Sequence, residues 1–112
     1  MSDKIKKVLC VCSVNRLRSP TAAEVLSQSP FNFNTRSCGI DLDFAIVPIS
    51  KNLLHWADEI VCMERHHFIV VLELLDKFKI DGKRILKLDI EDKFEFRSNE
   101  LKELIESNYN SK

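Results

Sequence analysis

Short runs with the character of β-strands alternate along the chain with longer segments of helical spacing. The first run, from Val8 to Cys12, is almost continuously apolar, as is typical of a strand buried on both faces of a parallel sheet. Further strands are expected at about 35–38, 59–63 and 84–88, each followed by a polar or turn-forming residue. The pattern therefore predicts four strands.

The helices expected between these strands begin at recognisable polar residues. Ser19 followed by Pro20 is the pattern of an N-cap with proline at the first helical position, and Ser50 and Ser98 are candidate N-caps of two later helices. A further helix is expected at about 64–76, and it is unusually apolar. This alternation, with short right-handed connections, predicts an α/β fold: a four-stranded parallel sheet with helices on both faces.

The composition is that of an ordinary globular protein. The 112 residues, 45% of them apolar, suffice for one compact domain, which we expect to span residues 1–112. Basic and acidic side chains number 17 each, so we expect no nucleic acid and no membrane among the partners. Any recognition of an anion must therefore be local.

The four cysteines are expected to be thiols in the cytoplasm. The apolar run behind the N-terminal lysines is only about five residues long, far shorter than the core of a signal peptide. Without a secretory context, the cysteines are better explained as thiols than as a disulfide framework. Cys62 and His66 have a spacing that zinc tolerates, but no second pair in the sequence completes a four-ligand site, so we expect no metal.

In the segment from Cys12 to Ser19, five residues separate a thiol from the guanidinium of Arg18, which stands directly before a hydroxyl and a helix start. Such a loop can turn its backbone N–H groups inward, and a helix N-terminus adds roughly half a positive charge. Arg18 can donate two parallel hydrogen bonds to phosphate, and the positive field favours the thiolate form of Cys12. Ser19 can donate its hydroxyl to that thiolate. We therefore expect a phosphate-binding loop formed by Ser13, Val14, Asn15, Arg16, Leu17, Arg18 and Ser19.

A buried cysteine at a strand end is the alternative explanation of Cys12, because cysteine is among the most buried residue types. However, the motif stands where a strand ends and a helix begins, and open α/β sheets bind ligands at the carboxyl ends of their strands. Position and motif together favour the functional interpretation.

The segment from Val8 to Glu24 resembles the low-molecular-weight protein tyrosine phosphatase family, and in particular a compact bacterial branch of it. The family's loop is Cys-x5-Arg-Ser-Pro. Later segments resemble the family in the right order, so that the resemblance covers most of the chain; they are 37–39, 48–50, 58–64 and 90–94.

The resemblance implies a mechanism without cofactor or metal. Cys12 attacks phosphorus, the loop amides and Arg18 hold the phosphate oxygens, and Asp92 is the general acid and base. Asp89, three residues earlier, is the substitute candidate for that acid. Asn15 is expected to fix the loop through side-chain hydrogen bonds, with Ser37 as the partner that the resemblance suggests; an ordinary turn asparagine is the alternative.

Several loop and wall residues differ from the longer members of the family. Val14 stands where these members have glycine, Leu17 replaces a second cysteine, and Lys93 and Phe94 replace the proline and tyrosine beside the acid. The resemblance offers Phe94 and Phe44 as aromatic walls beside the phosphate, with burial in the core as the alternative. Arg16 is expected to point to solvent, where it either favours acidic substrates or has no contact. Ser37 and Cys38 correspond to the family's Ser-Ala pair.

Three functions follow from these expectations. The first is hydrolysis of phosphate monoesters, with phosphotyrosine or another aryl phosphate as the substrate implied by the resemblance; the physiological substrate stays open, a phosphorylated protein or a small phosphate ester. The second is a catalytically inert phosphate-binding or interaction module. The third, an arsenate reductase, needs further cysteines to collect oxidising equivalents, and none follows Cys62.

The apolar helix predicts a possible contact between copies of the chain. From Ile69 to Leu75 apolar side chains point almost all around the helix, which should have one wet face. Either a homo-oligomer or deeper burial explains this pattern.

Overall fold

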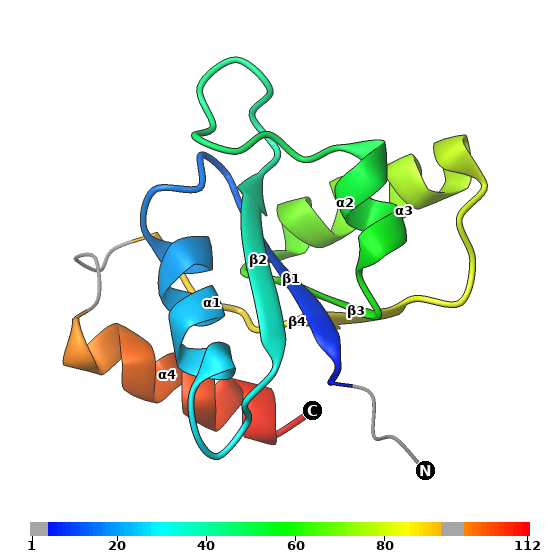
Figure 1. Cartoon of the computed structure of the whole chain (residues 1–112). Helices are drawn as coiled ribbons and strands as arrows, with labels where there is room; N and C mark the ends of the chain where they lie inside the picture. The colour runs from blue at the N-terminus through cyan, green and yellow to red at the C-terminus, as the bar shows by residue number, and fades with distance from the viewer. Residues whose placement is uncertain (1–4, 93–97) are drawn as a thin grey trace, which may run out of the picture.

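The computed structural model describes residues 5–92 and 98–112, and within these ranges strands and helices alternate throughout (Figure 1). In chain order the elements are β1 Lys7–Cys12, α1 Arg18–Ser27, β2 Asn34–Gly39, α2 Lys51–Trp56, β3 Glu59–Cys62, α3 Arg65–Phe78, β4 Arg84–Lys87 and α4 Asn99–Asn110. The strand and helix bounds agree with the sequence-based expectations to within about two residues, which is the usual precision of element ends.

The four strands form one parallel sheet in the order β2-β1-β3-β4. β1 lies between β2 and β3, so that Leu9 stands opposite Arg36 on one side and Ile60 on the other. The expected α/β fold with a four-stranded parallel sheet is confirmed.

Helices cover both faces of the sheet, as predicted (Figure 1). α1 and α4 pack on the face to which Val8, Cys10 and Cys12 point. α2 and α3 pack on the other face, against Leu9 and Val11. The apolar run of β1 is continuous because each of its faces contributes to a separate part of the core.

Two of the three predicted helix caps are correct. The hydroxyls of Ser50 and Ser98 accept hydrogen bonds from the backbone N–H groups three residues on, at 3.2 Å each. The third prediction is wrong: α1 begins at Arg18, its N-cap is Leu17, and no side chain caps it. Ser19 lies inside the first turn, and its hydroxyl donates to the side chain of Asn15 instead of capping the helix.

Helix α3 presents only part of its apolar surface to the core. Val71 and Leu75 are buried against the sheet, whereas Ile69 and Leu72 are each 43% exposed. Among residues 5–92 and 98–112, no helix is long and apolar enough to cross a membrane.

The carboxyl ends of β1, β3 and β4 lie at one edge of the sheet, since the strands are parallel. The β1–α1 loop, the start of α3 and the segment that follows β4 therefore come together, although they lie far apart in the sequence.

Candidate active site

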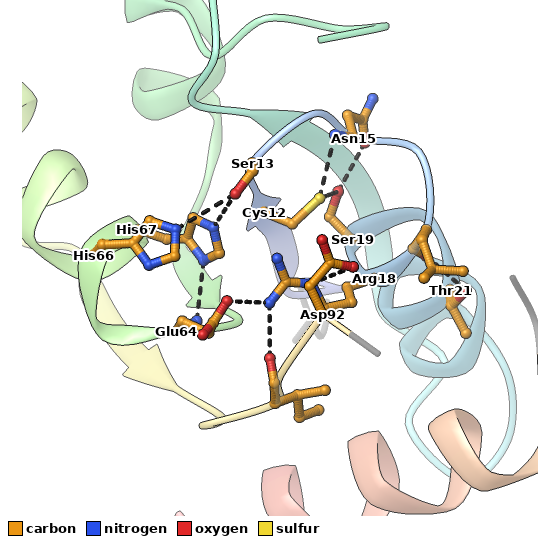
Figure 2. Close-up of polar contacts among 12 residues, drawn as sticks. Cys12, Ser13, Asn15, Arg18, Ser19, Thr21, Glu64, His66, His67 and Asp92 are labelled. Carbon is orange, nitrogen blue, oxygen red and sulfur yellow. Dashed lines mark hydrogen bonds and ion pairs between the residues drawn. The ribbon is translucent and has the colours of Figure 1, made fainter. Parts of the chain in front are cut away.

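The loop after β1 surrounds the sulfur of Cys12 with hydrogen-bonding groups. The backbone N–H of Asn15 donates to Cys12 Sγ at 3.2 Å, and the hydroxyl of Ser19 lies 3.0 Å from the same atom (Figure 2). Cys12 is only 3% exposed, at the end of its strand. A thiolate at this position receives direct hydrogen-bond stabilisation, and the uncapped N-terminus of α1 stands next to it.

The backbone of the loop turns at Asn15, which adopts a left-handed conformation with φ of 57°. Asparagine tolerates this region, whereas a β-branched residue does not. Val14 does not have a positive φ, so a valine in place of glycine causes no strain of this kind.

The expected hydrogen bond between Asn15 and Ser37 is not formed. The side-chain oxygen of Asn15 instead accepts from Ser19 at 2.8 Å, and no hydrogen bond within residues 5–92 and 98–112 joins Asn15 to Ser37. The expected role is retained with a different partner, because the buried carboxamide fixes the turn to the start of α1.

Gly39 at the end of β2 lets the loop approach the sheet closely. A Cβ atom there would lie 2.5 Å from the carbonyl oxygen of Ser13 and 2.9 Å from the backbone nitrogen of Asn15. Only glycine permits this contact, which places the loop against the neighbouring strand.

Arg18 is buried and anchored at one of its terminal nitrogens. Its Nη1 donates to the carbonyl oxygen of Ile90 at 2.8 Å and to the carboxylate of Glu64, and its Nε lies 3.9 Å from Asp92 Oδ1. Within residues 5–92 and 98–112 no protein acceptor is bonded to Nη2. The anchor thus fixes the plane of the guanidinium and leaves hydrogen-bonding capacity for an anion.

Glu64 is a residue of the site that the sequence analysis missed. Burial alone would raise the pKa of its carboxyl group, but the hydrogen bond and charge of Arg18 outweigh burial and lower that pKa below its ordinary value. The available signal was an acidic residue directly after a strand that ends beside the loop.

His67, also missed, connects the loop to the start of α3. Its Nδ1 accepts a hydrogen bond from the backbone N–H of Glu64 at 3.0 Å, so the ring proton belongs on Nε2. Nε2 lies 2.9 Å from the hydroxyl oxygen of Ser13 and donates to it (Figure 2). Burial, with the nearby His66 and Arg18 in support, lowers the pKa of His67 to about 4, so the ring is neutral at physiological pH.

Glu64, His66 and His67 are the one group of potential metal ligands in the described part of the chain, with ligand atoms within 4.8 Å of one another. The hydrogen bonds of the group do not suit a metal. A ligating imidazole nitrogen must be free of its proton, whereas Nε2 of His67 holds it, and the Glu64 carboxylate is paired with Arg18. Cys62, considered with His66 in the sequence analysis, is buried in the core on the α2 and α3 face and is not part of the group.

The two candidate acids occupy different surroundings. Asp92 lies at Arg18, with a side chain that is 65% exposed. Asp89 instead forms an ion pair with Lys87 at 3.5 Å and lines a pocket of about 280 Å³ with Glu64, Arg65 and Glu91.

The expected aromatic walls are only partly described. Phe44 is 68% exposed, so burial in the core is excluded for it. Its carbonyl oxygen accepts a 3.5 Å hydrogen bond from the exposed Arg16, which therefore has a contact of its own. Lys93 and Phe94 lie outside the described residues.

No family model matches the sequence, and no curated protein matches it. Solved structures do. Wzb from Vibrio vulnificus, in complex with benzylphosphonate, is 21% identical with a TM-score of 0.71, over 96% of this chain and 97% of that one. The YwlE arginine phosphatase from Geobacillus stearothermophilus is 21% identical with a TM-score of 0.69, over 95% and 92%.

A third solved structure is described as a low-molecular-weight protein tyrosine phosphatase. SP-PTP, a low-molecular-weight protein tyrosine phosphatase from Streptococcus pyogenes, is 18% identical with a TM-score of 0.69, over 96% of this chain and 90% of that one. At these identities the likeness concerns the fold. The chain has the fold of the low-molecular-weight protein tyrosine phosphatases, as the resemblance predicted.

Proposed function

We propose that this protein is a phosphatase that hydrolyses phosphate monoesters with Cys12 as its nucleophile. The observation that supports this most directly is the pair of hydrogen-bonding groups, Asn15 N–H and the Ser19 hydroxyl, directed at the Cys12 sulfur. Both groups can donate to a sulfur anion at the base of a loop whose remaining amides precede a helix N-terminus.

The proposed reaction has two steps. In the first, the thiolate of Cys12 attacks phosphorus, the bond from phosphorus to the ester oxygen breaks, and Asp92 gives its proton to the leaving oxygen. In the second, the Asp92 carboxylate takes a proton from water, the oxygen of which attacks the thiophosphate. Inorganic phosphate leaves and the thiolate is restored. Arg18 and the loop amides stabilise the charge on the phosphoryl oxygens in both steps.

Asp92 is preferred to Asp89 as the acid because of its surroundings. Its carboxylate lies beside Arg18 and is largely open to solvent, so it is accessible to a leaving group and to water. Asp89 is paired with Lys87 instead.

Two substrate classes are candidates for this site. Aryl phosphates such as phosphotyrosine follow from the resemblance. Phosphoarginine, in which phosphorus is bonded to nitrogen instead of an ester oxygen, is the second. One protein of similar fold is an arginine phosphatase, and three of the four residues that line the pocket at Glu64 are acidic. A basic substituent of the substrate would be attracted to that pocket.

The alternatives are weaker. An inert phosphate-binding module would not need an exposed carboxylate beside Arg18, such as that of Asp92. An arsenate reductase needs accessible thiols, and Cys10, Cys38 and Cys62 are all fully buried. A thiolate mechanism also fits the cytoplasmic location expected from the sequence, because the nucleophile must stay reduced.

The test is steady-state kinetics on an aryl phosphate and on phosphoarginine, with wild type and variants. We expect Cys12→Ser to abolish turnover on the preferred substrate, and Asp92→Asn to lower kcat by about 10²- to 10⁴-fold. Arg18→Lys should weaken both binding and rate, since an ammonium cannot reproduce the planar fork. Asp89→Asn is the matched control and should retain wild-type kcat.

Two outcomes would overturn parts of this assignment. Turnover by Cys12→Ser at the wild-type rate would exclude Cys12 as the nucleophile. A loss of kcat in Asp89→Asn but not in Asp92→Asn would show that Asp89 is the general acid.

A further inference from the structure

The structure contains a hydrogen-bonded connection that the proposed reaction does not use. It runs from the backbone N–H of Glu64 through the ring of His67 to the hydroxyl of Ser13, the residue after the nucleophile (Figure 2). Each link has ordinary hydrogen-bond geometry, at 3.0 and 2.9 Å.

We propose that His67 is a positioning residue of the phosphate loop, and that it acts by holding the hydroxyl of Ser13 in a fixed place. The inference rests on the proposed function, because it concerns the loop that would bind phosphate.

The direction of the hydrogen bond is determined by the surroundings of the ring. Nδ1 can only accept from Glu64 N–H, so Nε2 can only donate to Ser13. His67 is fully buried, so water cannot replace Ser13 as its partner. A buried donor left without a partner destabilises the folded state, so the hydrogen bond to Ser13 is strongly preferred.

The lowered pKa of His67 supports this arrangement. A ring that stays neutral down to about pH 4 keeps Nδ1 as an acceptor and Nε2 as a donor over the whole physiological range.

Ser13 is then fixed on both its side chain and its backbone. Its carbonyl oxygen accepts from the backbone N–H of Asp41 at 2.9 Å, while its hydroxyl accepts from His67. Two residues further on, the N–H of Asn15 points at the Cys12 sulfur. Because Ser13 is the first residue of the turn, fixing it limits the directions that the following amides can take.

The same helix start also holds the other end of the loop. Glu64 and His67 form a reciprocal capping box at the N-terminus of α3, in which each side chain accepts from the backbone N–H of the other residue. The Glu64 carboxylate binds Arg18, and the His67 ring binds Ser13. The first turn of α3 thus contacts the loop at its beginning and at its end.

A helix cap alone would make a different prediction, and the chain offers variants that separate the two roles. In His67→Gln the carboxamide oxygen can still accept from Glu64 N–H, as glutamine does at this position of capping boxes, whereas the ring nitrogen that donates to Ser13 is lost. Ser13→Ala removes the other partner and leaves the helix untouched. Ser13→Thr keeps the hydroxyl, and His55→Gln changes an exposed histidine of α2 that has no contact with the loop.

The experiment is isothermal titration calorimetry with inorganic phosphate on the full chain, together with thermal unfolding of each variant. We expect His67→Gln and Ser13→Ala each to weaken phosphate binding by about three- to tenfold. The double variant should bind no more weakly than Ser13→Ala does, because both changes remove the bond between His67 and Ser13. Ser13→Ala also removes the longer contact of the hydroxyl with Nε2 of His66, at 3.4 Å. Ser13→Thr, which restores the hydroxyl, should bind phosphate more tightly than Ser13→Ala does, and His55→Gln should bind as wild type does.

Unchanged phosphate affinity in His67→Gln, with only a lower melting temperature, would reduce His67 to a helix cap and overturn the proposal. Independent, multiplying losses in the double variant would also overturn it. A wild type that binds phosphate but hydrolyses neither the aryl phosphate nor phosphoarginine would contradict the proposed function alone, since the calorimetric comparison does not depend on turnover.

Discussion

The hydroxyl of Ser19 has one proton and three acceptors within reach: Cys12 Sγ at 3.0 Å, Asn15 Oδ1 at 2.8 Å and the carbonyl oxygen of Cys38 at 3.2 Å. When Cys12 is a thiol, its S–H can donate to Ser19 while Ser19 donates to Asn15. When Cys12 is a thiolate, the Ser19 proton turns to sulfur, because a hydrogen bond to an ion is roughly twice as strong as a neutral one. One side chain therefore serves both protonation states without a movement of the loop.

The other thiols of the chain are poorly placed to react with an oxidised Cys12. Cys38 and Cys62 belong to the core on the opposite face of the sheet, and Cys10 points in parallel with Cys12 from the same strand. Burial raises the pKa of all three thiols, that of Cys62 to about 12, so they are not nucleophilic at neutral pH. Leu17 occupies the loop position at which a neighbouring cysteine could have formed a bridge.

We therefore predict that hydrogen peroxide drives Cys12 to the sulfinic acid, and that with glutathione present Cys12 forms a mixed disulfide instead. Phosphate should protect Cys12 by occupying the loop. Intact-mass spectrometry with peptide mapping measures this. A dominant loss of two hydrogens, mapped to an internal bridge at Cys12, would contradict the prediction.

At the scale of the element, the first turn of α3 makes stability depend on pH. His67 has an ordinary pKa of 6.5 when the chain is unfolded and a pKa of about 4 when it is folded. Between these values the unfolded state binds a proton that the folded state does not, so stability falls as the pH decreases from about 6.5 to about 4. The pKa of Glu64 is also lowered in the folded state, so protonation of Glu64 at still lower pH reduces the stability further.

We expect this effect of His67 to amount to on the order of 3 kcal/mol between pH 7 and pH 4, at about 1.4 kcal/mol per pKa unit. Urea unfolding at a series of pH values, for wild type and His67→Gln, measures it. The variant should lose less stability on acidification than wild type does. Equal pH dependence in both proteins would show that His67 does not titrate in this way.

At the scale of the whole molecule, the amino ends and the carboxyl ends of the strands make different contacts. The edge opposite the loop contains Glu59, which is buried, accepts a 2.6 Å hydrogen bond from Tyr109 and pairs with Lys6 and Arg84 at 3.3 Å each. These contacts tie β3 to β4, α4 and the start of β1. The carboxyl ends of the strands carry the loop and its charged partners.

The remaining apolar surface lies beside α3 and predicts weak self-association. Ile69 and Leu72 are partly exposed on the helix, and Leu42, 66% exposed, lines an apolar groove of about 210 Å³ next to it. A stable interface buries about 800 Å² per partner, which two or three side chains do not supply. We therefore expect a dimer only at high protein concentration.

Sedimentation velocity over a range of concentrations tests this expectation. Leu72→Glu should abolish the association, whereas Glu73→Gln, an exposed polar change on the same helix, should leave it intact. A wild type that stays monomeric at the highest concentration would contradict it and leave the exposed side chains as ordinary surface.

The sequence by itself determined the order of the elements and the position of the loop. Alternating strand and helix patterns are local signals, and a thiol, an arginine and a helix start within eight residues stay together in any fold that forms β1 and α1. Tertiary structure decided what surrounds this loop. Glu64 lies 46 residues from Arg18, and His67 lies 54 residues from Ser13, so no local pattern could pair them.

The same reason explains the corrections. Ser19 has the sequence of an N-cap, yet its hydroxyl bonds to Asn15 and reaches Cys12, because the loop curls back over the end of β1. The sequence offers Asp92 as the acid and Asp89 as its substitute. The path of the chain after β4 brings Asp92 to Arg18, whereas Asp89 pairs with its near neighbour Lys87. Parallel strands collect their carboxyl ends at one edge, so the chemistry of that edge depends on the order of strands in the sheet rather than on distance along the chain.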